Sequence, residues 1–271
     1  MFTRLIVAGF IATGLGGCVS RVDLHEVARG SSLEPQVLTT TPYPLQALLP
    51  VGTTYPHLRV YIEGDGHAWA TRTQPSTDPT PAMSLTARLA VEDTRPAAYL
   101  ARPCQFISGP NCTQEVWTSG RFDASVISAM GAGLDTLKQR YGVERFELVG
   151  YSGGGAVALV LAATRSDVEQ VQTLAGNLDP LYWAQMLNLS PLKKPVTPLH
   201  YRDALRHIAQ RHFIGQDDEV VPPAVTQAYA AQLLGDCLQI VSAKATHSVG
   251  LEQLWSAYSN GPIACGVSAG S

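Results

Sequence analysis

The chain has 271 residues, of which 45% are hydrophobic and 15% are charged, and its formal net charge is −3. This length and apolar content suffice for one compact domain with a substantial core. The mild acidity and the lack of a basic run argue against nucleic acid as a partner. No repeat period is visible in the sequence, which argues against solenoid and propeller architectures.

The N-terminal residues have the pattern of a secretory signal. Arg4 supplies one positive charge, residues 5–13 are almost wholly apolar, and the sequence Leu-Gly-Gly-Cys follows at 15–18. The apolar stretch is too short to span a membrane as a helix. The sequence at 15–18 resembles the lipobox of bacterial lipoproteins. This resemblance implies that residues 1–17 are a signal peptide and that Cys18 is acylated.

A lipid on Cys18 would attach the protein to a membrane of the bacterial cell envelope, facing the periplasm. No Asp follows the cysteine, and in enterobacterial-type sorting this favours the outer membrane over the inner one. The polar, proline-containing stretch to about Leu49 predicts that residues 18–54 form a lipidated N-terminus and tether, followed by an edge element. We expect the main folded domain over residues 55–271.

Hydrophobic patterning predicts strands and helices that alternate along this domain. We expect strands near 58–63, 96–101, 145–150, 169–175, 210–214 and 237–243, and helices near 83–91, 121–141, 153–165, 223–235 and 249–258. Such alternation is typical of an α/β fold with a mostly parallel central sheet and helices on both faces. Functional loops are then expected at the carboxyl ends of the strands.

The cysteines fit an oxidising compartment. Apart from Cys18 there are four, an even number that can form two disulfides. Cys104 and Cys112 flank a loop short enough for a bridge to close, and Cys237 and Cys265 would tie the last strand to the C-terminal tail. Of the three possible connectivities, we favour these two pairs.

The most informative motif is Gly-Tyr-Ser-Gly-Gly at residues 150–154, between an apolar run at 146–149 and a stretch of small and apolar residues. Strand, G-x-S-x-G and helix is the context of a nucleophile elbow. There a tight, strained turn exposes the central side chain above the sheet. Ser152 is therefore the candidate nucleophile.

A serine nucleophile needs a base and an acid that orients the base. His247 follows the predicted strand at 237–243 and is the candidate base. Asp218 lies in an acidic loop after the strand at 210–214 and is the favoured acid. Its neighbour Asp217 is the next candidate, and Asp179 is a rival because it follows an earlier strand.

The order Ser152, Asp218, His247 is the one used by the α/β-hydrolase superfamily. The stretch 215–222 resembles the G-x-x-D-x-x-V/T-P acid turn of that superfamily. The resemblance covers roughly residues 55–260. It implies an α/β-hydrolase fold and a serine hydrolase that cleaves an ester or related acyl bond through an acyl-enzyme.

The same resemblance implies an oxyanion hole. One donor would be the backbone N–H of Gly153, directly after the nucleophile. The sequence Glu-Gly-Asp-Gly at 63–66 resembles the H-G-x-G loop of the superfamily, with Glu63 in place of the usual histidine. By that alignment the Asp65 N–H is the second donor.

Aromatic residues near these loops are candidates for the substrate pocket. They are Tyr151, Trp69 and Trp183, and the last lies in an insertion at 179–198 that in this superfamily often forms a cap. An aromatic, leucine-rich cap suits a small-molecule or lipid-like acyl substrate, but the same segment could be a small helix packed on the core.

We expect no metal and no cofactor. His67 lies near Asp65 and Glu63, but no second cluster with ligand spacing accompanies it. The glycines at 150–155 do not have the G-x-G-x-x-G spacing of a dinucleotide loop. The alternative to an enzyme is a catalytically silent hydrolase fold that binds partners in the envelope. The sequence favours the enzyme because no member of the triad is missing.

Overall fold

The computed structural model describes residues 21–235 and 237–265. A single eight-stranded sheet runs through the described part in the order β1-β2-β4-β3-β5-β6-β7-β8. The strands are β1 (Leu33–Leu38), β2 (Leu45–Pro50), β3 (His57–Ile62), β4 (Ala97–Leu100), β5 (Arg145–Tyr151), β6 (Val168–Leu174), β7 (Ala209–Gly215) and β8 (Leu238–Ala243). Strands β3 to β8 pair in parallel, whereas β2 is antiparallel to both of its neighbours.

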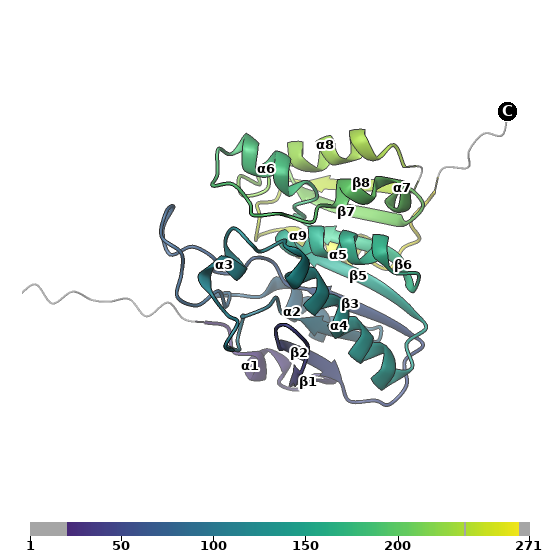
Figure 1. Cartoon of the computed structure of the whole chain (residues 1–271). Coiled ribbons are helices and arrows are strands. Elements are labelled where there is room, and N and C mark those ends of the chain that lie inside the picture. The colour runs from purple at the N-terminus through teal and green to yellow at the C-terminus, as the bar shows by residue number, and fades with distance from the viewer. Residues whose placement is uncertain (1–20, 236, 266–271) are drawn as a thin grey trace, which may run out of the picture.

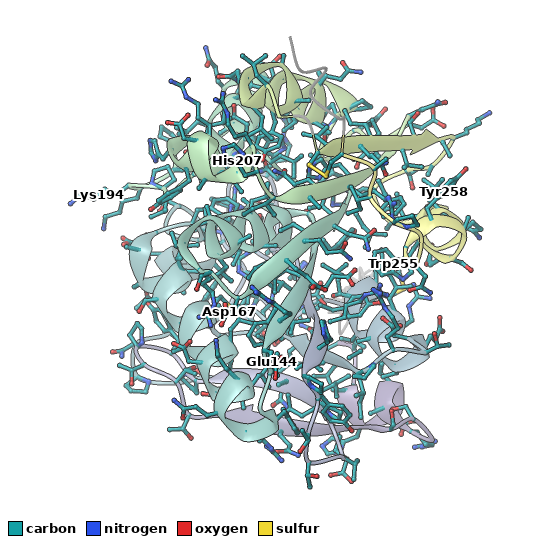
Figure 2. All side chains as sticks on the ribbon, turned by 90° about the vertical axis from the view of Figure 1, so that its right-hand side faces the viewer. Glu144, Asp167, Lys194, His207, Trp255 and Tyr258 are labelled. Carbon is teal, nitrogen blue, oxygen red and sulfur yellow. A yellow bond between two sulfur atoms is a disulfide. The ribbon has the colours of Figure 1, made fainter. Side chains whose placement is uncertain are left out.

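Helices cover both faces of the sheet (Figure 1). They are α1 (Leu24–Ala28), α2 (Leu85–Glu92), α3 (Gln114–Trp117), α4 (Ala124–Tyr141), α5 (Gly153–Thr164), α6 (Pro180–Met186), the 3-10 turn η1 (Pro198–Tyr201), α7 (Arg202–Leu205), α8 (Pro223–Leu233) and α9 (Leu251–Tyr258). Helices α4, α5, α7 and α8 pack on one face, and α1, α2 and α9 on the other. Figure 2 shows α4 and α9 on opposite sides of the strands. Within the described ranges, no helix is long and apolar enough to cross a membrane.

The predicted α/β architecture is confirmed, and each predicted strand and helix is present within three residues at either end. The long helix α4 illustrates why. The carboxylate of Asp123 accepts from the N–H groups of Ser125 and Val126 at its start, and Gly142 ends it with a left-handed φ of 65°. Both are the residue types that favour such helix ends.

The expected tether is shorter than predicted, because the chain joins the sheet well before residue 55. Strands β1 and β2 form an antiparallel hairpin, and β2 pairs with β4. Leu45, Leu48 and Leu49 of β2 are fully buried. Pro35, one of the prolines that suggested a tether, lies in β1, where an edge strand tolerates the missing N–H. The predicted signal peptide (1–17) and lipidation site (Cys18) lie outside the described residues.

The described chain begins beside the loop that precedes α2. Arg21 donates from Nη2 to the carbonyl oxygen of Asp78 at 3.1 Å, and its Nε lies 3.4 Å from the Asp78 carboxylate. The Val22 N–H donates to the carbonyl oxygen of Pro81 at 3.2 Å. These contacts fix the point at which the N-terminal segment reaches the domain.

Two disulfides are present, with the pairing that the spacing favoured. Cys104 bonds to Cys112 in the loop after β4, and Cys237 bonds to Cys265 in the C-terminal tail. Arg211 of β7 also holds the tail, donating to the carbonyl oxygens of Tyr258 and Pro262 at 2.6 Å each. The chain after α9 is thereby attached to the β7–β8 edge of the sheet.

His212 of β7 is fully buried in a small polar cluster. Its Nδ1 lies 2.8 Å from the Thr173 hydroxyl and its Nε2 lies 3.2 Å from Oε1 of Gln210, which also accepts from the Tyr229 hydroxyl. A neutral ring satisfies both contacts, since Nε2–H donates and Nδ1 accepts. Burial lowers the pKa of His212 from 6.5 to about 3.

We therefore predict an acid-dependent loss of stability that depends on His212. The unfolded chain binds a proton on this imidazole below pH 6.5, whereas the folded chain binds it only near pH 3. The stabilisation that the neutral, buried His212 gives to the fold is therefore complete above pH 6.5 and decreases as the pH drops toward 3. Between pH 7 and pH 4 the free energy of unfolding should lose on the order of 3 kcal/mol from this group. Urea unfolding at both pH values measures it.

The control is His207→Gln, which changes an exposed histidine near the same strand. His212→Gln should reduce the loss of stability between pH 7 and pH 4, whatever its stability at pH 7, whereas His207→Gln should leave that loss unchanged. Equal pH dependence in the two variants would contradict the prediction.

Candidate active site

Ser152 occupies the turn between β5 and α5, at the carboxyl end of the central strands. Its backbone has φ 51° and ψ −125°, a left-handed region that side chains rarely adopt. The turn is held on both sides: the Ser152 N–H donates to Leu174 O at 3.0 Å, and its carbonyl accepts from the N–H of Asn177 at 2.8 Å. The strained turn is thus fixed by the end of β6 and the loop after it.

Two glycines allow the backbones around this turn to approach closely. A Cβ at Gly150 would stand 2.4 Å from the carbonyl oxygen of Gly154. A Cβ at Gly154 would stand 2.5 Å from the carbonyl oxygen of Glu63 and 2.6 Å from that of Ile62. These atoms belong to the backbone and cannot rotate away, so the small residues two positions either side of Ser152 are required by packing.

The structure brings Ser152, His247 and Asp218 into one hydrogen-bonded chain. Nε2 of His247 lies 3.0 Å from Oγ of Ser152, and Nδ1 lies 2.8 Å from Oδ2 of Asp218. Because an ionised carboxylate only accepts, the ring proton belongs on Nδ1. Nε2 is then free to accept a proton from the serine hydroxyl. The ring of Tyr151 packs 5.1 Å from that of His247, and its hydroxyl donates to the His247 carbonyl oxygen at 3.1 Å.

Of the three candidate acids, only Asp218 contacts the histidine. Its side chain is buried, and its Oδ1 accepts from the N–H groups of Val220 and Val221 at 2.9 and 2.8 Å. These bonds leave Oδ2 directed at His247. Asp217 is exposed. Asp179 caps α6, where its carboxylate accepts from the Tyr182 N–H at 3.1 Å.

The loop after β3 lies directly against the serine turn. A Cβ at Gly64 would stand 3.1 Å from Cβ of Ser152, and one at Gly153 would stand 2.0 Å from Oδ1 of Asp65. Neither the Gly153 N–H nor the Asp65 N–H donates to any acceptor within the described residues. The two residues predicted to supply oxyanion donors are therefore close together, and neither backbone N–H is engaged by another described residue.

Glu63, which replaces the histidine expected in this loop, is a buried support. The Gly64 N–H donates to its Oε1 at 2.8 Å, and the Tyr99 hydroxyl donates to its Oε2 at 3.0 Å. Ser84 also donates to Oε2. Burial raises the pKa of the Glu63 carboxyl. The three donors fix the direction of the loop as it leaves β3.

Two arginines beside Asp65 were not predicted from the sequence. Nη1 of Arg102 lies 3.4 Å from Asp65 Oδ1, and Nε of Arg121 lies 3.2 Å from Asp65 Oδ2. Arg102 also donates to the carbonyl oxygen of Arg121. The position of Arg102, two residues after β4, was a signal that could have identified it, because parallel strands end at the same edge of the sheet.

These loops enclose a cavity of about 580 Å³ that opens beside Ser152 and His247. Its lining includes the three aromatic residues proposed from sequence, Tyr151, Trp69 and Trp183, together with the side chains of Met83, Leu189, Arg121 and others. This volume suits a small-molecule ligand. Within residues 21–235 and 237–265, no three His, Cys, Asp or Glu side chains cluster as metal ligands would.

The insertion at 179–198 forms one wall of this cavity. Its helix α6 packs against the acid turn: Trp183 and Ala184 contact Val221 and Val225. The Trp183 indole N–H donates to the Val220 carbonyl oxygen at 2.7 Å. The segment is therefore both a helix packed on the domain and part of the pocket lining.

Solved structures with a similar fold are numerous. An esterase of Pyrococcus furiosus superposes with a TM-score of 0.63 at 13% identity, over 89% of this chain and 93% of that one. A Xanthomonas campestris α/β serine hydrolase without a lid gives 0.54 at 13% identity, over 83% and 91%. A putative dienelactone hydrolase of Klebsiella pneumoniae gives 0.54 at 16%, over 82% and 89%.

The chain has the α/β-hydrolase fold. The predicted fold class is thereby confirmed. Compared by sequence, the chain matches no protein-family model and no curated protein. At such low sequence identity, the similarity to solved structures concerns the fold alone. The chemistry of the site follows from its own residues.

We predict that Gly154→Ala destabilises the fold by about 2–3 kcal/mol, because the new methyl group would overlap two carbonyl oxygens of β3 and its loop. Gly131→Ala in α4 is the matched control. There the nearest atom to the new Cβ is Leu161 Cδ2 at 3.6 Å, so the free energy of unfolding of this variant should rise by roughly 0.5–1 kcal/mol. Urea unfolding compares the two. Equal stability of both variants would contradict the packing argument.

A second prediction concerns the acid. Asp218→Asn should lower kcat for an activated ester about 10³–10⁴-fold while the chain stays folded, because the amide no longer holds the productive tautomer of His247. Asp217→Asn and Asp179→Asn should stay within about twofold of the wild type. Hydrolysis of 4-nitrophenyl butyrate measures all three. A larger loss in either control variant would move the acid role to that residue.

Proposed function

We propose that this protein is a serine hydrolase that cleaves an ester or a related acyl bond through an acyl-enzyme. The observation that carries the proposal is the unbroken chain from Ser152 Oγ through His247 to the buried Asp218, with contacts of 3.0 and 2.8 Å. Ser152 and His247 line the cavity, where a bound substrate would lie within their reach. Structures with a similar fold include an esterase and an acylaminoacyl peptidase, which is consistent with this class of reaction.

In the proposed reaction, each contact of the triad serves one proton transfer. As Ser152 Oγ attacks the carbonyl carbon, its proton passes to His247 Nε2, and Asp218 stabilises the imidazolium that forms. The oxygen of the tetrahedral intermediate would receive hydrogen bonds from the N–H groups of Gly153 and Asp65. The imidazolium then returns the proton to the leaving alcohol as the C–O bond breaks. In the second half of the reaction, water attacks the acyl carbon while the same nitrogen takes its proton. That proton passes to Ser152 Oγ as the acyl–oxygen bond breaks and the acid leaves.

We further propose that the enzyme is held on the bacterial cell envelope by a lipid on Cys18, facing the periplasm and more readily at the outer than the inner membrane. The support is the sequence pattern at 15–18 and the two disulfides, which suit an oxidising compartment. Incorporation of radiolabelled palmitate into the wild type, but not into Cys18→Ser, is the expected result.

An activity-based probe tests the proposed reaction. The purified protein should react covalently with a fluorophosphonate at Ser152, identified by mass spectrometry, because only an activated serine attacks this phosphorus centre at neutral pH. Labelling should fall at least 100-fold in His247→Ala.

The control is Ser190→Ala, which removes another serine of the same cavity and should leave labelling unchanged. A folded wild-type chain whose Ser152 does not react would contradict the proposal. It would favour the alternative, a hydrolase fold that binds envelope partners without catalysis.

A further inference from the structure

The Arg121 guanidinium is buried in the wall of the proposed active site without a full set of partners. Only 8% of its side-chain surface is exposed to solvent, and Nε is buried with no hydrogen bond of good geometry. Nε approaches Asp65 Oδ2 at 3.2 Å. The two Nη atoms donate to no acceptor within the described residues, yet they are not among the fully buried unpaired atoms. Arg121 lines this cavity and also a much smaller one beside Arg102 and Trp117, and its unpaired Nη atoms are the donors that remain for a ligand.

The local charges leave Arg121 short of an anion. The Asp65 carboxylate is shared, with Oδ1 facing Arg102 and Oδ2 facing Arg121. Glu63, the other carboxyl in the cavity wall, has both oxygens occupied by Gly64, Ser84 and Tyr99, and it forms no ion pair within the described ranges. Two guanidinium groups therefore share one carboxylate. A buried cation is stable only with a compensating partner, which a ligand can supply.

The orientation of the guanidinium is fixed before any ligand arrives. Arg121 stacks over the ring of Trp183 at 5.1 Å, and the Trp183 indole is held by its bond to Val220. The Phe122 ring lies 5.7 Å away on another side. A guanidinium held in this way presents its Nη atoms as a planar fork, which matches the two oxygens of a carboxylate.

We infer that Arg121 binds a carboxylate carried by the substrate, so that the enzyme acts on esters with a free carboxyl group rather than on neutral esters alone. The inference rests on the proposed function and names its substrate class. Because Asp65 touches both Arg121 and Gly153, the bound carboxylate would lie one side chain away from the reacting carbonyl. The apolar lining, with Met83, Trp69 and Trp183, suits a short apolar or aromatic spacer between the two groups.

Matched ester pairs test this inference with the purified protein. One pair carries the charge on the acyl side: 4-nitrophenyl hydrogen glutarate and its methyl ester. The other carries it on the alcohol side: 4-carboxyphenyl butyrate and its methyl ester. To correct for differences in intrinsic reactivity, kcat/KM for each ester is divided by the rate constant of its hydrolysis by hydroxide. We expect kcat/KM to favour the carboxylate at least tenfold in one pair, and the preference to vanish in Arg121→Gln.

Two further variants separate a specific contact from general electrostatics. Arg121→Lys keeps the charge beside Asp65 but lacks the fork, so it should fold and still lose most of the preference. Arg72→Gln removes an exposed cation from the cavity rim and should keep the preference within about threefold.

The outcomes distinguish the inference from the function on which it rests. Hydrolysis of the neutral esters with no preference for the carboxylate in either pair would overturn the inference and leave the hydrolase proposal standing. So would a preference that persists in both Arg121 variants. A chain that hydrolyses none of the four esters and fails to react with fluorophosphonate at Ser152 would overturn both.

Discussion

Contact between backbones, without intervening side chains, is the constraint on which this active site depends. The end of β3 and the start of α5 meet at Gly154, and the turn itself closes at Gly150. That approach places Gly153 against the Asp65 side chain, so the loop after β3 lies beside the turn that carries Ser152. It also holds Ser152 in a conformation that the serine would not adopt alone. His247 and Asp218 reach the serine from the loops after β8 and β7, which end at the same edge of the parallel sheet as β5.

Charge balance is the second constraint. An aspartate beside the proposed oxyanion site would repel the developing charge, and here Arg102 and Arg121 offset the charge of the Asp65 carboxylate. Burial lowers the pKa of Arg102, and the Asp65 carboxylate counters this effect. The loop after β3 is therefore tied to the chain after β4 by ion pairs. The Asp65 carboxylate of this loop faces both arginines.

The sequence allowed the sheet, the helices, the disulfide pairs and the three members of the triad to be proposed, because each depends on local patterns. Strand alternation, the glycines at 150 and 154 and the acid turn each extend over a few residues. The role of Arg121 depends on contacts between segments about 60 residues apart, and no local pattern encodes them. An edge element was expected before residue 55, but the two strands of the hairpin β1–β2 were not, because Pro35 and the short strands resemble a polar tether unless their pairing with β4 is known.

The contacts of Arg21 and Val22 with the loop before α2 bear on how a substrate of the proposed hydrolase would reach the cavity. That loop continues into Pro81, Ala82 and Met83, which line the cavity, and Met83 is 73% exposed. Three residues of chain span at most about 11 Å. If Cys18 is acylated as proposed, its lipid would hold the cavity mouth close to the bilayer. The orientation of the cavity mouth would then decide whether a substrate arrives from the membrane or from the aqueous side.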